Sequence, residues 1–314
     1  MNSMAPKLSV VLPCLNEGCH LEQTLRTIVE QLSFLGGDFE LLIIDDGSSD
    51  RTWEVIGRFD ATPGRIRGFK LSRRFGKELA LTAGLEHASG RAIVVMDADL
   101  QHPPMMLAEM VRLWESESYE IVEAVKDHRG SEVWTSKWGA RAFGMLHRWI
   151  CNIDLQDASD FKLMDRKVLD AWASMPERNV FFRGMNAWLG FRRIKLPFKV
   201  AERAGGQTHW SQTELIKLAF TGITAYSSLP LHLVTWMGLL FFGFAVSLGI
   251  FTVIAWLSGR AVEGFTTVIL LQLVIASMMM FSLGILGTYV SRIYEEVKGR
   301  PRYILSETSD RSST

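Results

Sequence analysis

The sequence lacks several features that mark common protein classes. Its three cysteines, Cys14, Cys19 and Cys151, are an odd number without a C-x-x-C pair, so they support neither a disulfide framework nor a thiolate zinc site. Positive charge is not in excess, because 34 Lys and Arg residues face 34 Asp and Glu residues. A nucleic-acid binder depends on an excess of basic residues that face phosphates, and the balanced composition therefore argues against nucleic acid as a partner.

Common nucleotide-binding and catalytic motifs are missing as well. No G-x-G-x-x-G follows the first apolar run and no G-x-x-x-x-G-K-[ST] occurs, which argues against a dinucleotide dehydrogenase and a P-loop nucleotidase. Neither H-E-x-x-H nor G-x-S-x-G is present. The apolar run from Leu8 to Pro13 is too short for the core of a signal peptide. We therefore expect the first domain to stay in a reducing compartment.

Charge is absent from two long stretches near the C-terminus. The run from Leu233 to Leu257 has no charged residue, and at 1.5 Å per residue its roughly 25 residues span about 37 Å, more than the ~30 Å hydrocarbon core of a bilayer. A second uncharged run covers Phe265 to Ser291 after a short turn. Because this turn cannot carry the chain back across a membrane, residues 233–291 predict a transmembrane hairpin. The alternative is a pair of buried helices in a soluble protein.

Basic residues predict the orientation of this hairpin. The turn holds Arg260 and Glu263, whereas the flank that follows the second run holds four basic residues: Arg292, Lys298, Arg300 and Arg302. Positive residues concentrate on the cytoplasmic side of membrane proteins. We therefore expect a multi-pass protein of the inner (plasma) membrane, in contact with membrane lipid, whose two termini and catalytic domain are cytoplasmic.

These patterns divide the chain into four segments. Residues 1–210 form the expected cytoplasmic domain, and residues 211–232 form an amphipathic region before the hairpin. The hairpin covers 233–291, and a cytoplasmic tail covers 292–314. Apolar residues between positions 215 and 223 recur on one helical stripe, which suits either a helix in the headgroup plane or an ordinary amphipathic helix.

Before residue 130, short apolar runs alternate with helical stretches. The runs are LSVVLP, ELLIID, IRGFKL, AIVVMD and YEIVEAV, and the helical stretches lie near 22–35, 52–59, 78–87 and 105–115. Continuous apolar strands separated by helices predict an α/β nucleotide-binding domain with a mainly parallel sheet covered on both faces. Ligands of such sheets bind beyond the carboxyl ends of the strands, so the residues after each run are the candidate site.

Acidic residues follow two of these runs. Asp97 and Asp99 come at the end of AIVVMD, where the alternation of extended backbone points both side chains the same way. Carboxylates and phosphate oxygens are preferred ligands of Mg²⁺ and Mn²⁺, so the pair predicts a metal that bridges to a diphosphate. Asp46 directly follows ELLIID and is expected to accept a hydrogen bond from a nucleotide base or ribose. The alternative for Asp97 and Asp99 is a solvated loop or helix cap before Pro103. The alternative for Asp46 is an Asx turn in the stretch DDGSSD, followed by Asp50 as the N-cap of a helix.

The motifs together resemble a known family. V-V-L-P-x-x-N-E, I-I-D-D-G-S-x-D-x-T, D-A-D-L-Q-x-P-P and the C-terminal R-I-Y-E-E-V-K-G-R-P are similar to those of family-two glycosyltransferases of the polyprenyl-phosphate branch, which includes dolichol-phosphate mannose synthases. The stretches SRRFGKELAL, DASDFKLMDRKV and PERNVFFRG look most like bacterial bactoprenol glucosyltransferases. The resemblance covers nearly the whole chain. It implies an A-type nucleotide-sugar-binding domain and metal-dependent, inverting transfer of one sugar.

The resemblance also implies roles for individual residues. Asp160 matches the acid proposed as catalytic base in this branch and joins Asp99 in catalysis; the alternative for Asp160 is a structural acid that pairs with a nearby arginine. The metal ligands would be Asp97, Asp99 and Gln101. The nucleotide sugar would meet Pro13, Leu15, Glu17, Ile44, Asp46, Asp97, Ala98, Lys126 and Arg203. The acceptor phosphate would meet Arg129, Arg141 and His209, the last of which stands where relatives often carry a lysine.

The resemblance favours UDP-glucose as donor and undecaprenyl phosphate as acceptor, in glucosylation of O-antigen lipopolysaccharide. The phosphate of such an acceptor has a second pKa of about 6, so it is mostly dianionic at neutral pH and needs little deprotonation. The alternatives are another donor, such as GDP-mannose or a UDP-amino sugar, a noncatalytic scaffold, and a processive polysaccharide synthase. Processive synthases usually carry Q-x-x-R-W, and Arg148-Trp149 is not preceded by that glutamine. Small residues such as Gly284 and Gly287 offer faces for a homo-oligomer.

Overall fold

The computed structural model describes residues 5–60, 62–99, 102–117, 119–126, 159–175, 177–178, 180–198, 229–259 and 264–311. These residues fall into two compact units. The first unit contains the described residues up to 198 together with residues 300–311, and the second contains the two long C-terminal helices.

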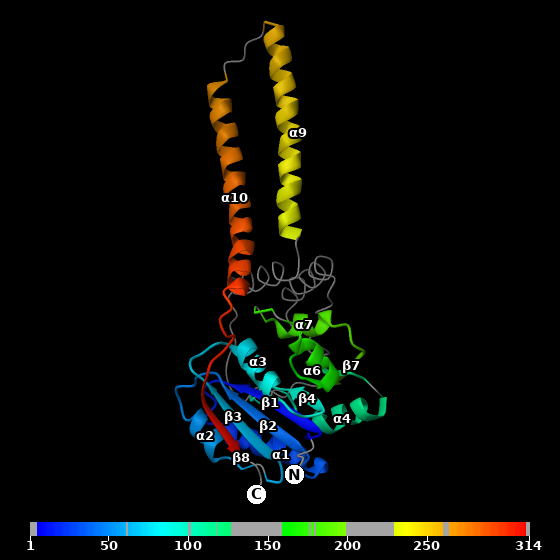
Figure 1. Ribbon diagram of the computed structural model, residues 1–314. Coiled ribbons are helices and arrows are strands. Elements are labelled where there is room, and N and C mark those ends of the chain that lie inside the picture. The colour runs from blue at the N-terminus through cyan, green and yellow to red at the C-terminus, as the bar shows by residue number, and fades with distance from the viewer. Residues whose placement is uncertain are drawn as a thin grey trace. The chain divides into compact units, whose positions relative to one another are not determined.

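The described residues of the first unit form an eight-stranded sheet with the order β7-β5-β6-β4-β1-β2-β3-β8 (Figure 1). Strands β1 to β4 run parallel, as do β5 and β7, whereas β6 and β8 are antiparallel to their neighbours. This arrangement confirms the predicted α/β class with a mainly parallel sheet. The strands are β1 (Leu8–Cys14), β2 (Phe39–Asp45), β3 (Arg65–Leu71), β4 (Ala92–Val95), β5 (Ile121–Lys126), β6 (Lys162–Asp165), β7 (Arg193–Phe198) and β8 (Leu305–Arg311).

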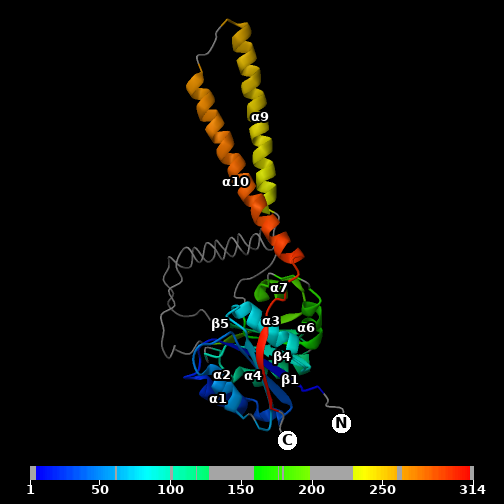
Figure 2. The ribbon, with the colours of Figure 1, turned by 60° about the vertical axis from the view of Figure 1, so that its left-hand side comes forward.

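Helices pack on both faces of the sheet (Figure 2) because successive strand residues point to opposite sides. Leu41 and Ile43 of β2 belong to the core under α1, α2 and α4, whereas Ile44 faces α3. Gly84 brings α3 close to the sheet, since a Cβ there would lie 2.3 Å from Cγ1 of Val11. The helices of this unit are α1 (Leu21–Gln31), η1 (Ser33–Leu35), α2 (Thr52–Arg58), α3 (Lys77–His87), α4 (Met106–Glu117), α6 (Arg166–Ala173) and α7 (Phe182–Trp188).

Strand β8 was not expected, because it lies in the stretch that we predicted as a tail. It pairs antiparallel with β3, from Ile66 opposite Arg311 to Leu71 opposite Leu305. Side chains reinforce the pairing, since the indole nitrogen of Trp53 donates to Oε2 of Glu307 at 2.8 Å. The chain therefore leaves the sheet, forms the two long helices and returns to the same sheet.

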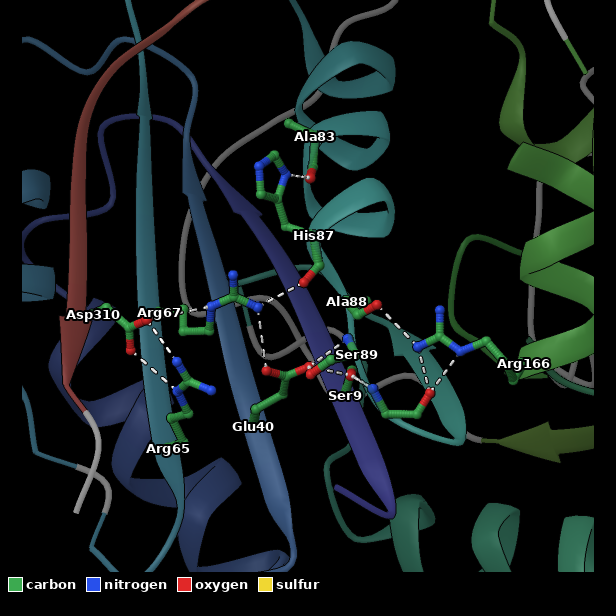
Figure 3. Close-up of polar contacts among 11 residues, drawn as sticks. Ser9, Glu40, Arg65, Arg67, Ala83, His87, Ala88, Ser89, Arg166 and Asp310 are labelled. Carbon is green, nitrogen blue, oxygen red and sulfur yellow. Dashed lines mark hydrogen bonds and ion pairs between the residues drawn. The ribbon is translucent and has the colours of Figure 1, made fainter. Parts of the chain in front are cut away.

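A buried carboxylate joins the amino ends of the central strands (Figure 3). Glu40 is 0% exposed, and its Oε1 accepts hydrogen bonds from the Ser9 hydroxyl at 2.6 Å and from the backbone N–H of Ser89 at 2.7 Å. Its Oε2 lies 3.5 Å from Nη1 of Arg67, which also donates to the carbonyl oxygen of His87 at 2.7 Å. These contacts lie at the edge opposite the strand ends where ligands bind, so they serve the stability of the sheet.

The second unit consists of α9 (Leu229–Leu257) and α10 (Phe265–Val297). Both helices contain a stretch long and apolar enough to cross a membrane, Val234–Ala255 and Leu271–Val297. Within the most apolar part of each stretch, 0% of the residues are buried in α9 and 6% in α10. A core helix of a soluble protein would be mostly buried. The exposure of these apolar side chains favours candidate membrane spans over the soluble alternative.

Candidate functional site

The loops after β1, β2, β3 and β4 meet at the carboxyl edge of the parallel strands. A cavity of about 240 Å³ lies there. Seven of the residues that we predicted to bind donor or metal line it: Pro13, Leu15, Glu17, Asp46, Asp97, Ala98 and Asp99. The sequence prediction did not include four further lining residues: Cys14, Arg74, Lys77 and Ala80.

A buried histidine, His102, holds the backbone of the segment that carries Asp97 and Asp99. The backbone N–H of Asp97 donates to Nδ1 of His102 at 3.0 Å, and the imidazole stacks on the ring of Phe161 with 4.9 Å between centroids. Burial lowers the pKa of His102, although the charge of Asp97 opposes this. A neutral ring whose Nδ1 carries no proton can accept this bond, so His102 fixes the start of the D-x-D segment.

The donor set of the cavity suits a divalent cation. Asp97 and Asp99 offer hard carboxylate oxygens, and Glu17 lines the same cavity. Burial raises the pKa of Glu17, and the charge of Asp99 raises it further, as expected where carboxylates gather with too little positive charge between them. Gln101, the third predicted ligand, lies outside the described residues. Among those described, no cluster of three or more His, Cys, Asp or Glu side chains is arranged to hold a metal.

The aspartates at the end of β2 organise two loops. Asp45 accepts a hydrogen bond from the backbone N–H of Ser48 at 2.9 Å, which is the Asx turn left open by the sequence. Asp46 accepts from the backbone N–H groups of Phe75 at 2.7 Å and Gly76 at 2.9 Å, although its carboxylate also lines the cavity. Burial raises the pKa of Asp46 despite these two hydrogen bonds. Asp46 therefore anchors the loop that leads into α3.

Ile44 occupies a different place from the other predicted donor contacts. It is 0% exposed, and its side chain would contact a Cβ added at Gly84 of α3. Its carbonyl oxygen accepts a hydrogen bond from the Cys14 thiol at 3.4 Å. Ile44 is thus part of the core behind the cavity, and it is not among the residues that line the space.

Lys77 connects the D-x-D segment to Asp160. Its Nζ lies 2.6 Å from Oδ1 of Asp97 and 2.9 Å from Oδ2 of Asp160. Burial lowers the pKa of Lys77, but the two carboxylates outweigh this effect and raise it. Lys77 begins α3 directly after Gly76, whose φ of 100° is a backbone conformation that glycine adopts without strain. The lysine is therefore placed by a tight turn and charged at neutral pH.

Asp160 has a second cationic partner in α7. Arg183 donates from Nε to Oδ1 and from Nη2 to Oδ2 of Asp160, so the pair is bidentate. Burial would raise the pKa of Asp160, but Arg183 and then Lys77 outweigh burial and hold this pKa well below its usual range. A carboxylate with such a low pKa is a weak proton acceptor. This arrangement is the one expected of a structural acid that pairs with a nearby arginine, and catalysis by Asp160 stays a prediction.

The remaining predicted residues are not placed. Arg129, Arg141, Arg203 and His209 lie outside the described residues, and of Lys126, at the end of β5, only the backbone is described. The predicted acceptor-phosphate site therefore stays a prediction. Two residues that sequence reasoning missed, Lys77 and Arg183, stand in the stretches SRRFGKELAL and PERNVFFRG, whose resemblance to bactoprenol glucosyltransferases was the available signal.

Comparison with known proteins decides the family. The sequence profile described as Glycosyl transferase family 2 matches residues 9–172. The chain belongs to glycosyltransferase family 2. This family-two glycosyltransferase is 35% identical over 302 residues to the uncharacterized glycosyltransferase YkcC of Bacillus subtilis, an alignment that covers 96% of this chain and 93% of YkcC. It is 32% identical over 304 residues to the bactoprenol glucosyl transferase of Shigella phage SfII, with 96% and 98% of the two chains covered.

These relatives confirm the resemblance to the polyprenyl-phosphate branch. Among solved structures, the mannosyltransferase PcManGT from Pyrobaculum calidifontis in complex with GDP-Man and Mn²⁺ aligns over 90% of this chain and 88% of its own. The TM-score of that alignment is 0.47, and the identity is 17%.

Proposed function

We propose that this glycosyltransferase transfers one glucose from UDP-glucose to undecaprenyl phosphate at the cytoplasmic face of the membrane. The observation that carries the proposal is the acidic cavity at the strand ends of a chain that aligns over 96% of its length with a bactoprenol glucosyl transferase. An oxygen of the acceptor phosphate attacks the anomeric carbon, and the bond from that carbon to the donor's diphosphate breaks. The attack inverts an α-linked donor, so the product is a β-linked lipid phosphosugar.

The cavity residues divide this work. Asp97 and Asp99, with Gln101, would hold Mg²⁺ or Mn²⁺, which when bound neutralises charge on the leaving diphosphate. Pro13, Leu15 and Glu17 would bind the nucleotide from the loop after β1. Asp46 would contribute from the end of β2, where it also fixes the loop before α3.

Basic residues would bind the phosphates on either side of the reacting carbon. We assign Lys126 and Arg203 to the donor, and Arg129, Arg141 and His209 to the acceptor. A guanidinium can bind two oxygens of one phosphate, which suits recognition of a dianionic headgroup.

Strand β8 supports the proposed membrane topology. β3 precedes the hairpin and β8 follows it, and two strands that pair in one sheet must lie on one side of a membrane. An even number of crossings satisfies this condition, as two spans do. The basic residues after α10 favour the cytoplasm for that side.

A transfer assay with purified protein tests the proposal. Undecaprenyl phosphate is incubated with radiolabelled UDP-glucose, GDP-mannose or UDP-N-acetylglucosamine in the presence of Mg²⁺ or Mn²⁺. We expect a lipid-linked monophosphate sugar that carries one residue, is labile to mild acid and forms with UDP-glucose. Efficient transfer from another donor would correct the sugar. A growing polysaccharide, or transfer that ignores the lipid phosphate, would overturn the proposed acceptor.

A further inference from the structure

Lys77 is a cation that lines the acidic cavity, and it has no role in the transfer mechanism proposed for this enzyme. Its ammonium bridges Asp97, a proposed metal ligand, and Asp160. Its side chain is 42% exposed, so a ligand in the cavity can reach it. An ammonium has three N–H donors, and Nζ of Lys77 lies within 2.9 Å of three carboxylate oxygens: Oδ1 and Oδ2 of Asp97 and Oδ2 of Asp160.

The backbone before Lys77 is fixed, whereas its side chain has rotatable bonds. Asp46 holds the N–H groups of Phe75 and Gly76, and the helix begins at Lys77 itself. Five single bonds, with four side-chain torsions, then separate the anchored Cα from the ammonium nitrogen. A change of side-chain torsion can thus move the charge across the cavity without a change in the loop.

The two carboxylates that hold Lys77 have different second partners. Asp160 is tied to Arg183 through both oxygens, so it keeps its place whether or not Lys77 stays on it. Asp97 belongs to the D-x-D pair and is needed by a divalent cation. A cation of two charges at Asp97 would repel the ammonium that now lies 2.6 Å away, and a diphosphate entering with the metal would attract it.

We propose that Lys77 is an internal cation of the donor site: it neutralises Asp97 in the free protein and binds the donor's diphosphate when a divalent cation takes Asp97. Asp160 and Arg183 are positioning residues that keep the lysine at the cavity wall during this exchange. The inference rests on the proposed function, because it takes a nucleoside diphosphate as the ligand.

The first test measures metal binding without nucleotide. Mn²⁺ is titrated into the full-length detergent-solubilised protein, and free Mn²⁺ is followed by electron paramagnetic resonance. Because Lys77→Met removes a competing positive charge, we expect it to bind Mn²⁺ about threefold more tightly or better. Lys77→Arg keeps the charge and should match the wild type. Lys167→Met is the control, since Lys167 pairs with Glu120 on the surface at 3.2 Å and does not line the cavity.

The second test measures diphosphate binding at saturating Mn²⁺. With UDP or GDP, whichever the wild type binds more tightly, Lys77→Met should weaken binding about tenfold, as the loss of a charge-assisted hydrogen bond does. The matching monophosphate should lose less. Lys77→Gln gives the same two measurements if the methionine variant does not fold, because its amide can still donate to Asp97 and Asp160.

Tighter Mn²⁺ binding combined with weaker diphosphate binding supports the inference, since a purely structural lysine would weaken both. Weaker or unchanged Mn²⁺ binding in the charge-free variants would overturn it, as would unchanged diphosphate binding. In either case a wild type that binds Mn²⁺ and a nucleoside diphosphate would leave the proposed function standing. A wild type that binds neither would refute the proposed function itself, and the inference with it.

Discussion

Arg183 donates two hydrogen bonds to Asp160, from Nε to Oδ1 at 2.7 Å and from Nη2 to Oδ2 at 2.9 Å. Bidentate pairs between a guanidinium and a carboxylate are among the strongest polar contacts in proteins, and this one involves a carboxylate side chain that is only 9% exposed. The pair keeps Asp160 ionised and oriented. The geometry thus favours positioning by Asp160 over proton transfer.

The stability of the protein should reveal this ion pair through its pH dependence. Because the folded-state pKa of Asp160 lies below its ordinary value of 3.8, its contribution to the free energy of unfolding is fully present above about pH 4 and is lost as pH falls through the lower folded-state pKa. We expect Asp160→Asn to unfold at a lower temperature than wild type at neutral pH, with the difference shrinking below about pH 4. Thermal unfolding in detergent measures this, with the exposed Asp170→Asn as control. A difference that persists unchanged into strong acid would contradict the assignment.

The rate of transfer should fall when the pH drops below the second pKa of the acceptor phosphate. If the acceptor phosphate reacts as its dianion, kcat/KM falls below about pH 6 as that phosphate takes up a proton. We expect the residual activity of Asp160→Asn to show the same acid limb, because Asp160 stays ionised throughout this range. Initial rates from about pH 5 to 8 measure it. An acid limb that disappears in the variant would instead favour Asp160 as the base.

Removal of the D-x-D carboxylates should abolish metal-dependent transfer. We expect Asp99→Asn to lower the rate at least about a hundredfold, because the leaving diphosphate loses stabilisation of several kcal/mol. A chelator should do the same to the wild type, and added Mn²⁺ should restore it. Glu22→Gln, which removes an exposed acid of α1 paired with Arg26, is the matched control. Full activity of Asp99→Asn with chelator present would exclude a metal at this position.

Much of this architecture follows from local sequence signals. The stretch expected as a helix at 105–115 is α4 at 106–117, and the one expected at 22–35 is α1 followed by η1. Apolar runs such as AIVVMD predict strands buried on both faces, because apolar residues occupy successive positions instead of alternating with polar ones. The strand-end rule then brings Asp46, Asp97 and Asp99 to one cavity, as the structure does.

The features that the sequence did not predict depend on distant partners. Strand β8 reads LSETSDR, a polar stretch that becomes a strand because the edge of β3 is available to it. Lys77 and Asp160 are 83 positions apart, and no local pattern shows which carboxylate a lysine will meet. The residue type and the position of a carboxylate at a strand end are enough to predict a ligand-binding role. The role of a cation such as Lys77 depends on its spatial neighbours, which the sequence does not show.

Strand β8 should stabilise the domain through its backbone more than through its surface charges. Truncation after Ile304 exposes the edge of β3, and we expect a fall of several degrees in unfolding temperature together with aggregation. Asp310→Asn breaks the exposed pair with Arg65, which has 2.6 Å between nitrogen and oxygen, and should cost less than about 1 kcal/mol. Scanning fluorimetry and light scattering measure both effects. Equal losses in the two variants would show that side chains dominate the pairing.

Thiol labelling should report the topology of the hairpin. In a variant without the native cysteines, a cysteine placed at Ser258, next to the turn between α9 and α10, should react with an impermeant reagent in cells whose outer membrane has been opened. A cysteine at Ser306 in β8 should react only after the inner membrane is broken. Both positions are exposed in the structure, so local burial does not explain a difference. The reverse pattern would move the catalytic domain to the other side of the membrane.

The pairing of β3 with β8 joins Arg65 to Asp310 across 245 positions of the chain. At a synthesis rate of about 5–20 residues per second, β3 waits roughly 12–50 s before its neighbour β8 is synthesised, and both apolar helices are made during this interval. During this interval the strand must resist pairing with other chains. Three basic residues along it, Arg65, Arg67 and Lys70, supply the repulsion that protects nascent sheet edges. The sheet is therefore complete only after both apolar helices have been synthesised.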